Sequence, residues 1–217
     1  MSEESRLRDL VCELARSMFE RGLTGGASGN ISLRLSDGGL LVTPTGSSFG
    51  RLDPARLSRF DASGRLVDGD PPTKEMPLHA AFYETRGAKA GAVVHLHSTH
   101  SVALSMLPDT DPDNVLPPLT AYSIMRLGKV KLLPIFRPGD PAMGEAIRGL
   151  AGKRSAVLLA NHGPVVAAKD LEAAVYAMEE LEETARLALL TRGLSPRMLS
   201  PAQVREVVEH FDVEWDD

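Results

Sequence analysis

Cysteine, surplus positive charge and long apolar runs are scarce or missing in this sequence of 217 residues. Its single cysteine, Cys12, cannot form an intrachain disulfide, and it falls within a helical apolar stripe. We interpret it as a small core hydrophobe in a reducing cytoplasm. The formal net charge of -5 leaves no basic excess to hold the phosphate backbone of a nucleic acid. We therefore expect no nucleic-acid partner.

Membrane and nucleotide signals are missing as well. No apolar run approaches the roughly 20 residues that a membrane-spanning helix needs. The first ten residues, MSEESRLRDL, are charged and lead into an amphipathic pattern instead of the apolar core of a secretory signal. No P-loop and no dinucleotide-binding glycine spacing occurs, so a nucleotide is not implied. These absences predict a cytoplasmic protein with no membrane partner.

The sequence does contain the pattern of one globular α/β domain. Apolar residues make up 43% of the chain, and a single domain of this length could bury roughly 70% of its unfolded surface. No internal repeat, low-complexity tract or linker divides the chain, so we expect one domain over residues 1–217. Strands and helices are interspersed along the chain, which indicates the α/β class.

Hydrophobic periodicity and turn residues predict the order of the elements. A β-hairpin is expected around the Asp37-Gly38 turn, a short helical turn at Pro54, and a surface loop over 108–118. Residues 164–168 are expected to lead back out of a turn at 161–163. The expected helices cover residues 4–22, 77–86, 99–107, 141–150, 170–191 and 201–210, and the expected strands cover 31–35, 40–43, the stretch with His95 and His97, 129–135 and 155–160.

Two histidines stand two residues apart in a stretch that is otherwise built for burial. The stretch is VVHLHSTH, and side chains at i and i+2 of a strand point to the same face, so we expect His95 and His97 to project side by side. Two neutral imidazoles held in this way favour a zinc site. The alternative is a pair of core histidines bonded to nearby backbone.

A third imidazole and a carboxylate could complete such a site. His162 falls where an apolar strand gives way to a turn, and Glu75 precedes a helix that begins near Pro77. Three histidines and one oxygen ligand suit zinc or another divalent metal, and a carboxylate that leaves the metal could act as a general acid or base. A turn histidine bonded to backbone and a helix-capping glutamate are the alternatives. Spacing alone does not show that the four side chains meet.

Two glycine-rich stretches offer backbone N–H groups and hydroxyls. They are GGASGN, which ends at Asn30, and TPTGSS, which contains Thr45 and Gly46. Such stretches can cradle a phosphate, although for either stretch taken alone ordinary turn glycines are the better explanation.

Five segments, in this order along the chain, carry a resemblance to a known family. They are GGASGNIS, TPTGSSFG, TKEMPLH, VVHLHSTH and LLANHGPVV. Together they resemble the class II aldolase/adducin family over nearly the whole chain. Within that family, TPTGSSFGRLDPARLS, HSTHSVALSML, LPPLTAY and ANHGPVVA resemble the 3-oxo-tetronate 4-phosphate decarboxylases.

The resemblance implies a fold, an assembly and a metal site. The fold is a single-domain α/β/α sandwich around a central β-sheet, assembled as a homotetramer. Each subunit is expected to hold a divalent metal, zinc or another ion such as manganese or cobalt. By motif position His95, His97 and His162 are the ligands, and Glu75 is the acid/base group beside the metal. Tyr122 resembles a tyrosine that family aldolases lend across a subunit boundary for protonation.

The resemblance also implies a phosphate-binding set. Asn30, Thr45 and Gly46 match phosphate-binding positions. Thr73 and Lys74 stand where family aldolases more often have two small hydroxyl residues. The C-terminal tyrosine of those aldolases has no clear match in HFDVEWDD.

The implied reaction is the decarboxylation of a 3-oxo-tetronate 4-phosphate to dihydroxyacetone phosphate and carbon dioxide through a metal-bound enediolate. The expected partner is therefore a small phosphorylated sugar acid. A class II sugar-phosphate aldolase, which would form the same enediolate, and a non-catalytic adducin-like module are the alternatives. A Schiff base on Lys74 is disfavoured because its neighbours do not desolvate it. We interpret His79, His100 and His210 as structural.

Overall fold

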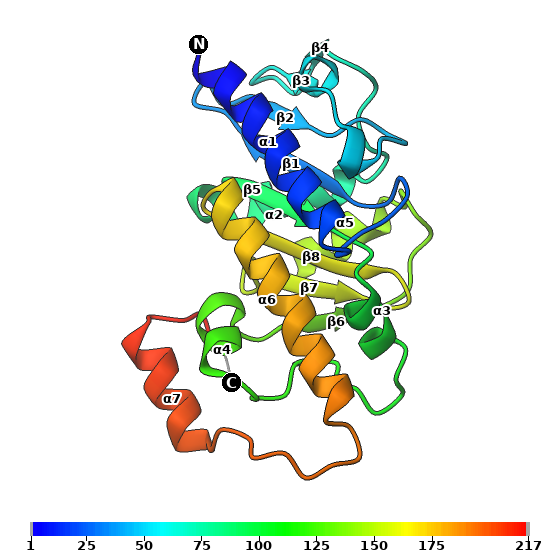
Figure 1. The fold of residues 1–217 in the computed structure, drawn as a ribbon. Coiled ribbons are helices and arrows are strands. Elements are labelled where there is room, and N and C mark those ends of the chain that lie inside the picture. Colours follow the sequence, from blue (N-terminus) through cyan, green and yellow to red (C-terminus); the bar gives the residue numbers. More distant parts are fainter. Residues whose placement is uncertain (1, 216–217) are drawn as a thin grey trace.

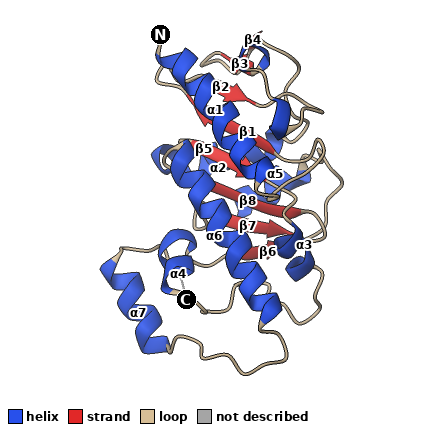
Figure 2. Cartoon of the chain, viewed as in Figure 1, coloured by secondary structure: helices blue, strands red, loops and turns tan. Residues whose placement is uncertain are grey.

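A single eight-stranded sheet forms the centre of the computed structural model, which describes residues 2–215 (Figures 1 and 2). Met1 and the last two aspartates of the HFDVEWDD tail lie outside the described residues. The strand order is β4-β3-β2-β1-β5-β8-β7-β6, and every pair is antiparallel except β6 with β7. The strands are β1 (Asn30–Arg34), β2 (Leu40–Val42), β3 (Ser58–Phe60), β4 (Leu66–Asp68), β5 (Ala92–His95), β6 (Lys131–Leu133), β7 (Ala156–Leu159) and β8 (Gly163–Ala168).

Helices cover both faces of this sheet, which confirms the predicted α/β/α sandwich. The first face carries α1 (Glu3–Glu20), α3 (Thr99–Ser105), α4 (Ala121–Leu127) and α6 (Leu171–Leu190), and the second carries α2 (Met76–Arg86) and α5 (Ala142–Gly149). α7 (Pro201–His210) packs beside α4. Figure 1 shows α1 and α6 in front of the sheet and α2 behind it. Three short 3-10 helices are η1 (Phe49–Arg51), η2 (Pro54–Arg56) and η3 (Gly87–Lys89).

The central strand β5 has apolar side chains on both faces. Ala92 and Val94 belong to the core under α1 and α6, whereas Val93 belongs to the core under α2 and α5. All three are fully buried. Burying each valine contributes on the order of 1.5–3 kcal/mol, so β5 is held firmly between the layers. The last residue of this strand, His95, is therefore a fixed position.

Side chains at the helix N-termini explain where several helices begin. Asp170 accepts a hydrogen bond from the backbone N–H of Ala173 at 2.7 Å and starts α6. Ser200 and Gln203 form a capping box at the start of α7. These starts agree with the helices expected from the sequence.

Several elements differ from the expected pattern. β5 ends at His95, so His97 lies just beyond the strand. Residues 164–168 belong to β8, which pairs with both β5 and β7 and does not lead out of the sheet. The strand expected over 129–135 is limited to β6. β3, β4 and α4 were not expected, and each is short: three residues for each strand and seven for the helix.

The helices and the single cysteine can also be compared with the expectations from the sequence. No helix among residues 2–215 is long and apolar enough to cross a membrane. Cys12 is partly buried against the core under α1, and burial raises the pKa of its thiol to about 11. The thiol is therefore protonated near neutral pH, as expected for a core residue.

Candidate metal centre and active site

The pairing of β5 with β8 brings two distant histidines to one end of the sheet. His95 is the last residue of β5, and His162 lies in the turn between β7 and β8. This turn passes very close to the chain that follows β5. A Cβ atom at Gly163, whose φ is +154°, would lie 2.1 Å from the carbonyl oxygen of Leu96. Only glycine fits there, so Gly163 lets the His162 turn approach His95.

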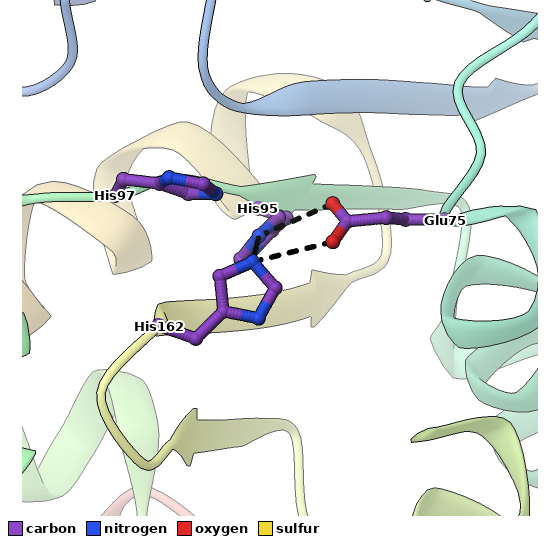
Figure 3. A group of neighbouring side chains, drawn as sticks. All are labelled: Glu75, His95, His97 and His162. Atoms are coloured by element: carbon purple, nitrogen blue, oxygen red, sulfur yellow. Dashed lines mark hydrogen bonds and ion pairs between the residues drawn. The ribbon is translucent and has the colours of Figure 1, made fainter. Parts of the chain in front are cut away.

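Four side chains converge at this end of the sheet (Figure 3). One ligand atom from each of Glu75, His95, His97 and His162 lies within 4.8 Å of the others. The three ring centroids are 4.7–5.0 Å apart. His95 is fully buried and His162 is 9% exposed, whereas His97 is exposed. The exposed His97 therefore marks the open side of the cluster.

Glu75 enters the cluster from the N-terminal end of α2. It is the N-cap residue, its backbone N–H lies 3.3 Å from Thr73 Oγ1, and it is 6% exposed. Its Oε2 lies 3.3 Å from His95 Nε2, and its Oε1 lies 3.2 Å from His162 Nε2. The carboxylate therefore faces two of the three imidazoles.

The hydrogen-bonding pattern of the cluster suits a bound cation. His95 Nδ1 donates to the carbonyl oxygen of Pro164 at 2.8 Å, so Nε2 of the neutral ring presents a lone pair to the centre. That nitrogen faces His162 Nε2 at 3.3 Å and a carboxylate oxygen of Glu75. Two ligands at 2.0–2.1 Å from a tetrahedral zinc ion are about 3.3–3.4 Å apart. The donor set and its spacing therefore fit zinc or a similar divalent ion.

The protonation states of the cluster residues also suit a bound cation. Burial lowers the pKa of both His95 and His97, which keeps the rings neutral, the form that binds metal. Burial raises the pKa of the Glu75 carboxyl, but the close approach of the His162 and His95 rings and the N–H of Asn30 outweigh it. The Glu75 pKa therefore lies below its ordinary range. The cluster combines neutral nitrogen ligands with one carboxylate.

The segments expected to bind phosphate lie next to the cluster. Thr45 donates its backbone N–H to the carbonyl oxygen of Pro71 at 3.0 Å, and Thr73 donates to that of Thr43 at 3.2 Å. The loop with Thr45 and Gly46 is therefore held beside the segment that leads into Glu75. Thr45, Gly46 and Lys74 are exposed, and Thr73 is buried.

Asn30 is bound inside the cluster instead of facing solvent. It is 5% exposed and pairs with His95 across β1 and β5. Its side chain donates to Glu75 and contacts His79. His79 was interpreted only as structural, yet it is fully buried behind the cluster. Glu75 and His79 are four residues apart at a helix start, a spacing that places them on one face but does not show the hydrogen bonds through Asn30.

Tyr122 lies apart from these residues. It is 61% exposed on α4 and lines a surface cavity of about 600 Å³ with side chains of α6 such as Tyr176 and Glu179. No member of the histidine cluster lines that cavity. Within one chain, Tyr122 is therefore not part of the cluster.

Comparisons with known proteins agree with this fold. The family model for the class II aldolase and adducin N-terminal domain matches residues 9–189. A 3-oxo-tetronate 4-phosphate decarboxylase of Escherichia coli is 47% identical over 204 residues, covering 94% of this chain and 96% of that protein. The crystal structure of YgbL from Escherichia coli superposes with a TM-score of 0.92 at 45% identity, covering 95% of this chain and 99% of that one. L-fuculose phosphate aldolase of Escherichia coli is 30% identical over 213 residues, covering 96% and 95%. This chain therefore belongs to the class II aldolase/adducin family.

Proposed function

We propose that this protein is a lyase that decarboxylates a 3-oxo-tetronate 4-phosphate to dihydroxyacetone phosphate and carbon dioxide. The observation that carries the proposal is the convergence of three imidazoles and Glu75, with donor atoms within 4.8 Å of one another. The 47% identity to a decarboxylase of this specificity supports the choice of substrate. One catalytic domain over residues 1–217, supported by the single sheet, is part of the proposal.

His95, His97 and His162 are the proposed ligands of a divalent cation, with Glu75 beside them. When bound, zinc, manganese or cobalt would supply Lewis-acid stabilisation of negative charge on the substrate oxygens. Loss of carbon dioxide from C1 leaves an electron pair at C2, and a proton must then reach that carbon. Glu75 Oε1 faces the cluster without a hydrogen bond, so it is the proposed group that takes up a proton from solvent and passes it to C2.

Recognition of the substrate phosphate is assigned to Asn30, Thr45, Gly46, Thr73 and Lys74. The hydrogen-bonded contact between the Thr45 loop and the Thr73 segment supports a shared binding surface. Lys74 is exposed and therefore suits an ionic contact with phosphate better than Schiff-base chemistry, which needs a desolvated amine.

The proposal includes a homotetramer in the cytoplasm. Tyr122 is 61% exposed and lines a cavity beside α4 and α6. A large aromatic side chain this exposed is often covered by a partner surface. If a neighbouring subunit covers this cavity, Tyr122 of one chain would lie beside the histidine cluster of the neighbouring chain and act there as a second proton donor. Size measurement in solution tests the assembly, and Tyr122→Phe tests the tyrosine.

The decisive experiment supplies the purified, zinc-loaded protein with a 3-oxo-tetronate 4-phosphate. We expect carbon dioxide and dihydroxyacetone phosphate in equal amounts, loss of both with a chelator, and recovery with added divalent ion. The observation behind the aldolase alternative is the lower, 30% identity to L-fuculose phosphate aldolase. Aldehyde release from L-fuculose phosphate without carbon dioxide from the acid would overturn the proposal in favour of an aldolase. Failure to bind a divalent ion at all would favour a non-catalytic module.

A further inference from the structure

A chain of buried hydrogen bonds runs from Glu75 into the core between β1 and α2. Asn30 Nδ2 donates to Glu75 Oε2 at 2.7 Å, and Asn30 Oδ1 is hydrogen-bonded to His79 Nε2. His79 Nδ1 lies 2.7 Å from Ser32 Oγ, which lies 2.8 Å from the hydroxyl of Tyr83. The five side chains thus form one continuous series that begins at the cluster and ends in the core.

The direction of each bond follows from the carboxylate. An ionised Glu75 only accepts, so the NH₂ group of Asn30 must face it, and Asn30 Oδ1 must face His79. An amide oxygen also only accepts, so His79 carries its hydrogen on Nε2 and accepts at Nδ1 from Ser32. Tyr83 then donates to Ser32. Every donor in the series points toward Glu75.

His79 is isolated from solvent and substrate. It is fully buried, as is Ser32, and Asn30 is 5% exposed. Burial lowers the pKa of His79 to about 4, so the ring is neutral near pH 7, in agreement with a single ring hydrogen. Any influence of His79 on a reaction must therefore pass through Asn30.

We propose that His79 is a positioning residue for Glu75. Its Nε2–H holds the Asn30 amide in the one orientation that presents an N–H to Glu75 Oε2. Glu75 Oε1 then stays free of hydrogen bonds and lies 3.2 Å from His162 Nε2, available to the cation and to a proton. Without the His79 donor, the Asn30 amide can rotate and turn its oxygen toward the carboxylate, which repels it.

The test compares His79→Met with His79→Gln, two unbranched side chains of similar size of which only glutamine carries an N–H donor. Zinc dissociation constants come from competition with a chromogenic chelator, and kcat and KM come from carbon dioxide release. We expect His79→Met to weaken zinc binding about tenfold, the lower end of the effect of losing a partner of a metal ligand, because His79 acts on Glu75 through Asn30. We also expect a kcat at least about tenfold lower at a KM within about threefold of the original. His79→Gln should recover most of both losses.

Tyr83→Phe is the matched control for a merely structural effect. It removes a buried polar group from the far end of the series and leaves the His79 donor to Asn30 in place. We expect a lower melting temperature with zinc affinity and kcat within about threefold of the unmodified protein. If His79→Met does not fold, His79→Leu replaces it in the comparison.

The outcomes separate this inference from the proposed function on which its kinetic arm rests. Equal losses in His79→Met and His79→Gln, or losses no larger than those of Tyr83→Phe at a matched melting temperature, would overturn the positioning role. If the unmodified protein binds zinc but releases no carbon dioxide, the proposed function fails. The zinc affinities of the variants still decide the inference in that case.

Discussion

The buried carboxylate of Glu75 and the partly buried carboxylate of Glu182 have opposite hydrogen-bonding environments. Glu182 on α6 accepts four hydrogen bonds of 2.6–2.9 Å from the backbone and side chains of His100 and Ser101. Glu75 accepts one from Asn30, and its Oε1 has no hydrogen-bond partner. A carboxylate with its acceptor sites filled stabilises the fold, whereas an unfilled one among nitrogen lone pairs is available for a cation or a proton.

The two carboxylates nevertheless act on the same segment of chain. Glu182 binds the first turn of α3, which begins two residues after His97. It therefore anchors the chain on one side of a proposed metal ligand, while β5 anchors it on the other. Replacing each carboxylate by its amide removes the charge with little change of shape, which separates the two roles.

The largest expected effect is that of Glu75→Gln on the reaction. An amide cannot transfer a proton, so kcat for carbon dioxide release should fall by about 10²–10⁴-fold. The free energy of unfolding of the metal-free protein should change by about 1 kcal/mol or less, because the amide oxygen can still accept the N–H of Asn30 and a buried charge is removed. Steady-state kinetics and urea unfolding measure the two quantities. If Glu75→Gln lost stability in proportion to its loss of activity, the catalytic role of Glu75 would be contradicted.

Glu182→Gln should show the reverse pattern. The amide NH₂ cannot accept the hydrogen bonds that one carboxylate oxygen now accepts, so we expect a loss of about 2–4 kcal/mol in the free energy of unfolding. The kcat of the folded fraction should stay within about threefold of the original. Urea unfolding followed by circular dichroism, with activity corrected for the folded fraction, provides the measurement. If stability were unchanged, Glu182 would not be the structural counterpart of Glu75.

Acidification should weaken the metal-free protein through His79. Burial lowers the folded-state pKa of His79 to about 4, against about 6.5 in the unfolded chain, so the unfolded chain binds more protons between these values. Stability is therefore highest above pH 6.5 and falls as the pH drops. The contribution of His79 between pH 6.5 and 5 is about 2 kcal/mol. We expect the free energy of unfolding, measured with urea at several pH values, to change less with pH in His79→Gln than in the unmodified protein. An equal dependence on pH would exclude His79 as the source.

The smallest effect is expected at a carboxylate on the surface. Glu84 receives two hydrogen bonds from Arg148 at 2.6 and 2.9 Å, but both side chains are about half exposed. Solvent screens such a pair, so Glu84→Gln should cost no more than about 1 kcal/mol and leave kcat unchanged. If Glu84→Gln lost more unfolding free energy than this, an exposed carboxylate would matter as much as the less exposed Glu182. The difference between Glu75 and Glu182 could then not be attributed to burial and hydrogen bonding.

The layers of the fold were predictable because apolar periodicity and capping residues are local signals. Asp170 and Ser200 mark helix starts that the structure confirms. β3 and β4 escaped because each has three residues, of which only one or two are apolar, whereas the equally short β2 is entirely apolar and follows the Asp37-Gly38 turn. β8 escaped because Pro164 stands second in it and resembles a turn residue.

The site was predictable only in part, because its residues are distant in sequence. His95 and His162 meet through the β5–β8 pairing, 67 residues apart, and no local spacing encodes that pairing. The family resemblance supplied it. The resemblance did not supply His79, whose role depends on side-chain hydrogen bonds that only coordinates reveal. The assignments of Asn30 and Tyr122 stay predictions.

Three imidazoles and a carboxylate with an unfilled oxygen form the proposed divalent metal site. The most direct measurement is a crystal structure of the zinc-loaded protein with anomalous diffraction recorded at the zinc absorption edge. We predict one strong anomalous peak per chain, about 2.0–2.1 Å from a ring nitrogen of each of His95, His97 and His162. A peak elsewhere, or none at full zinc loading, would contradict the account.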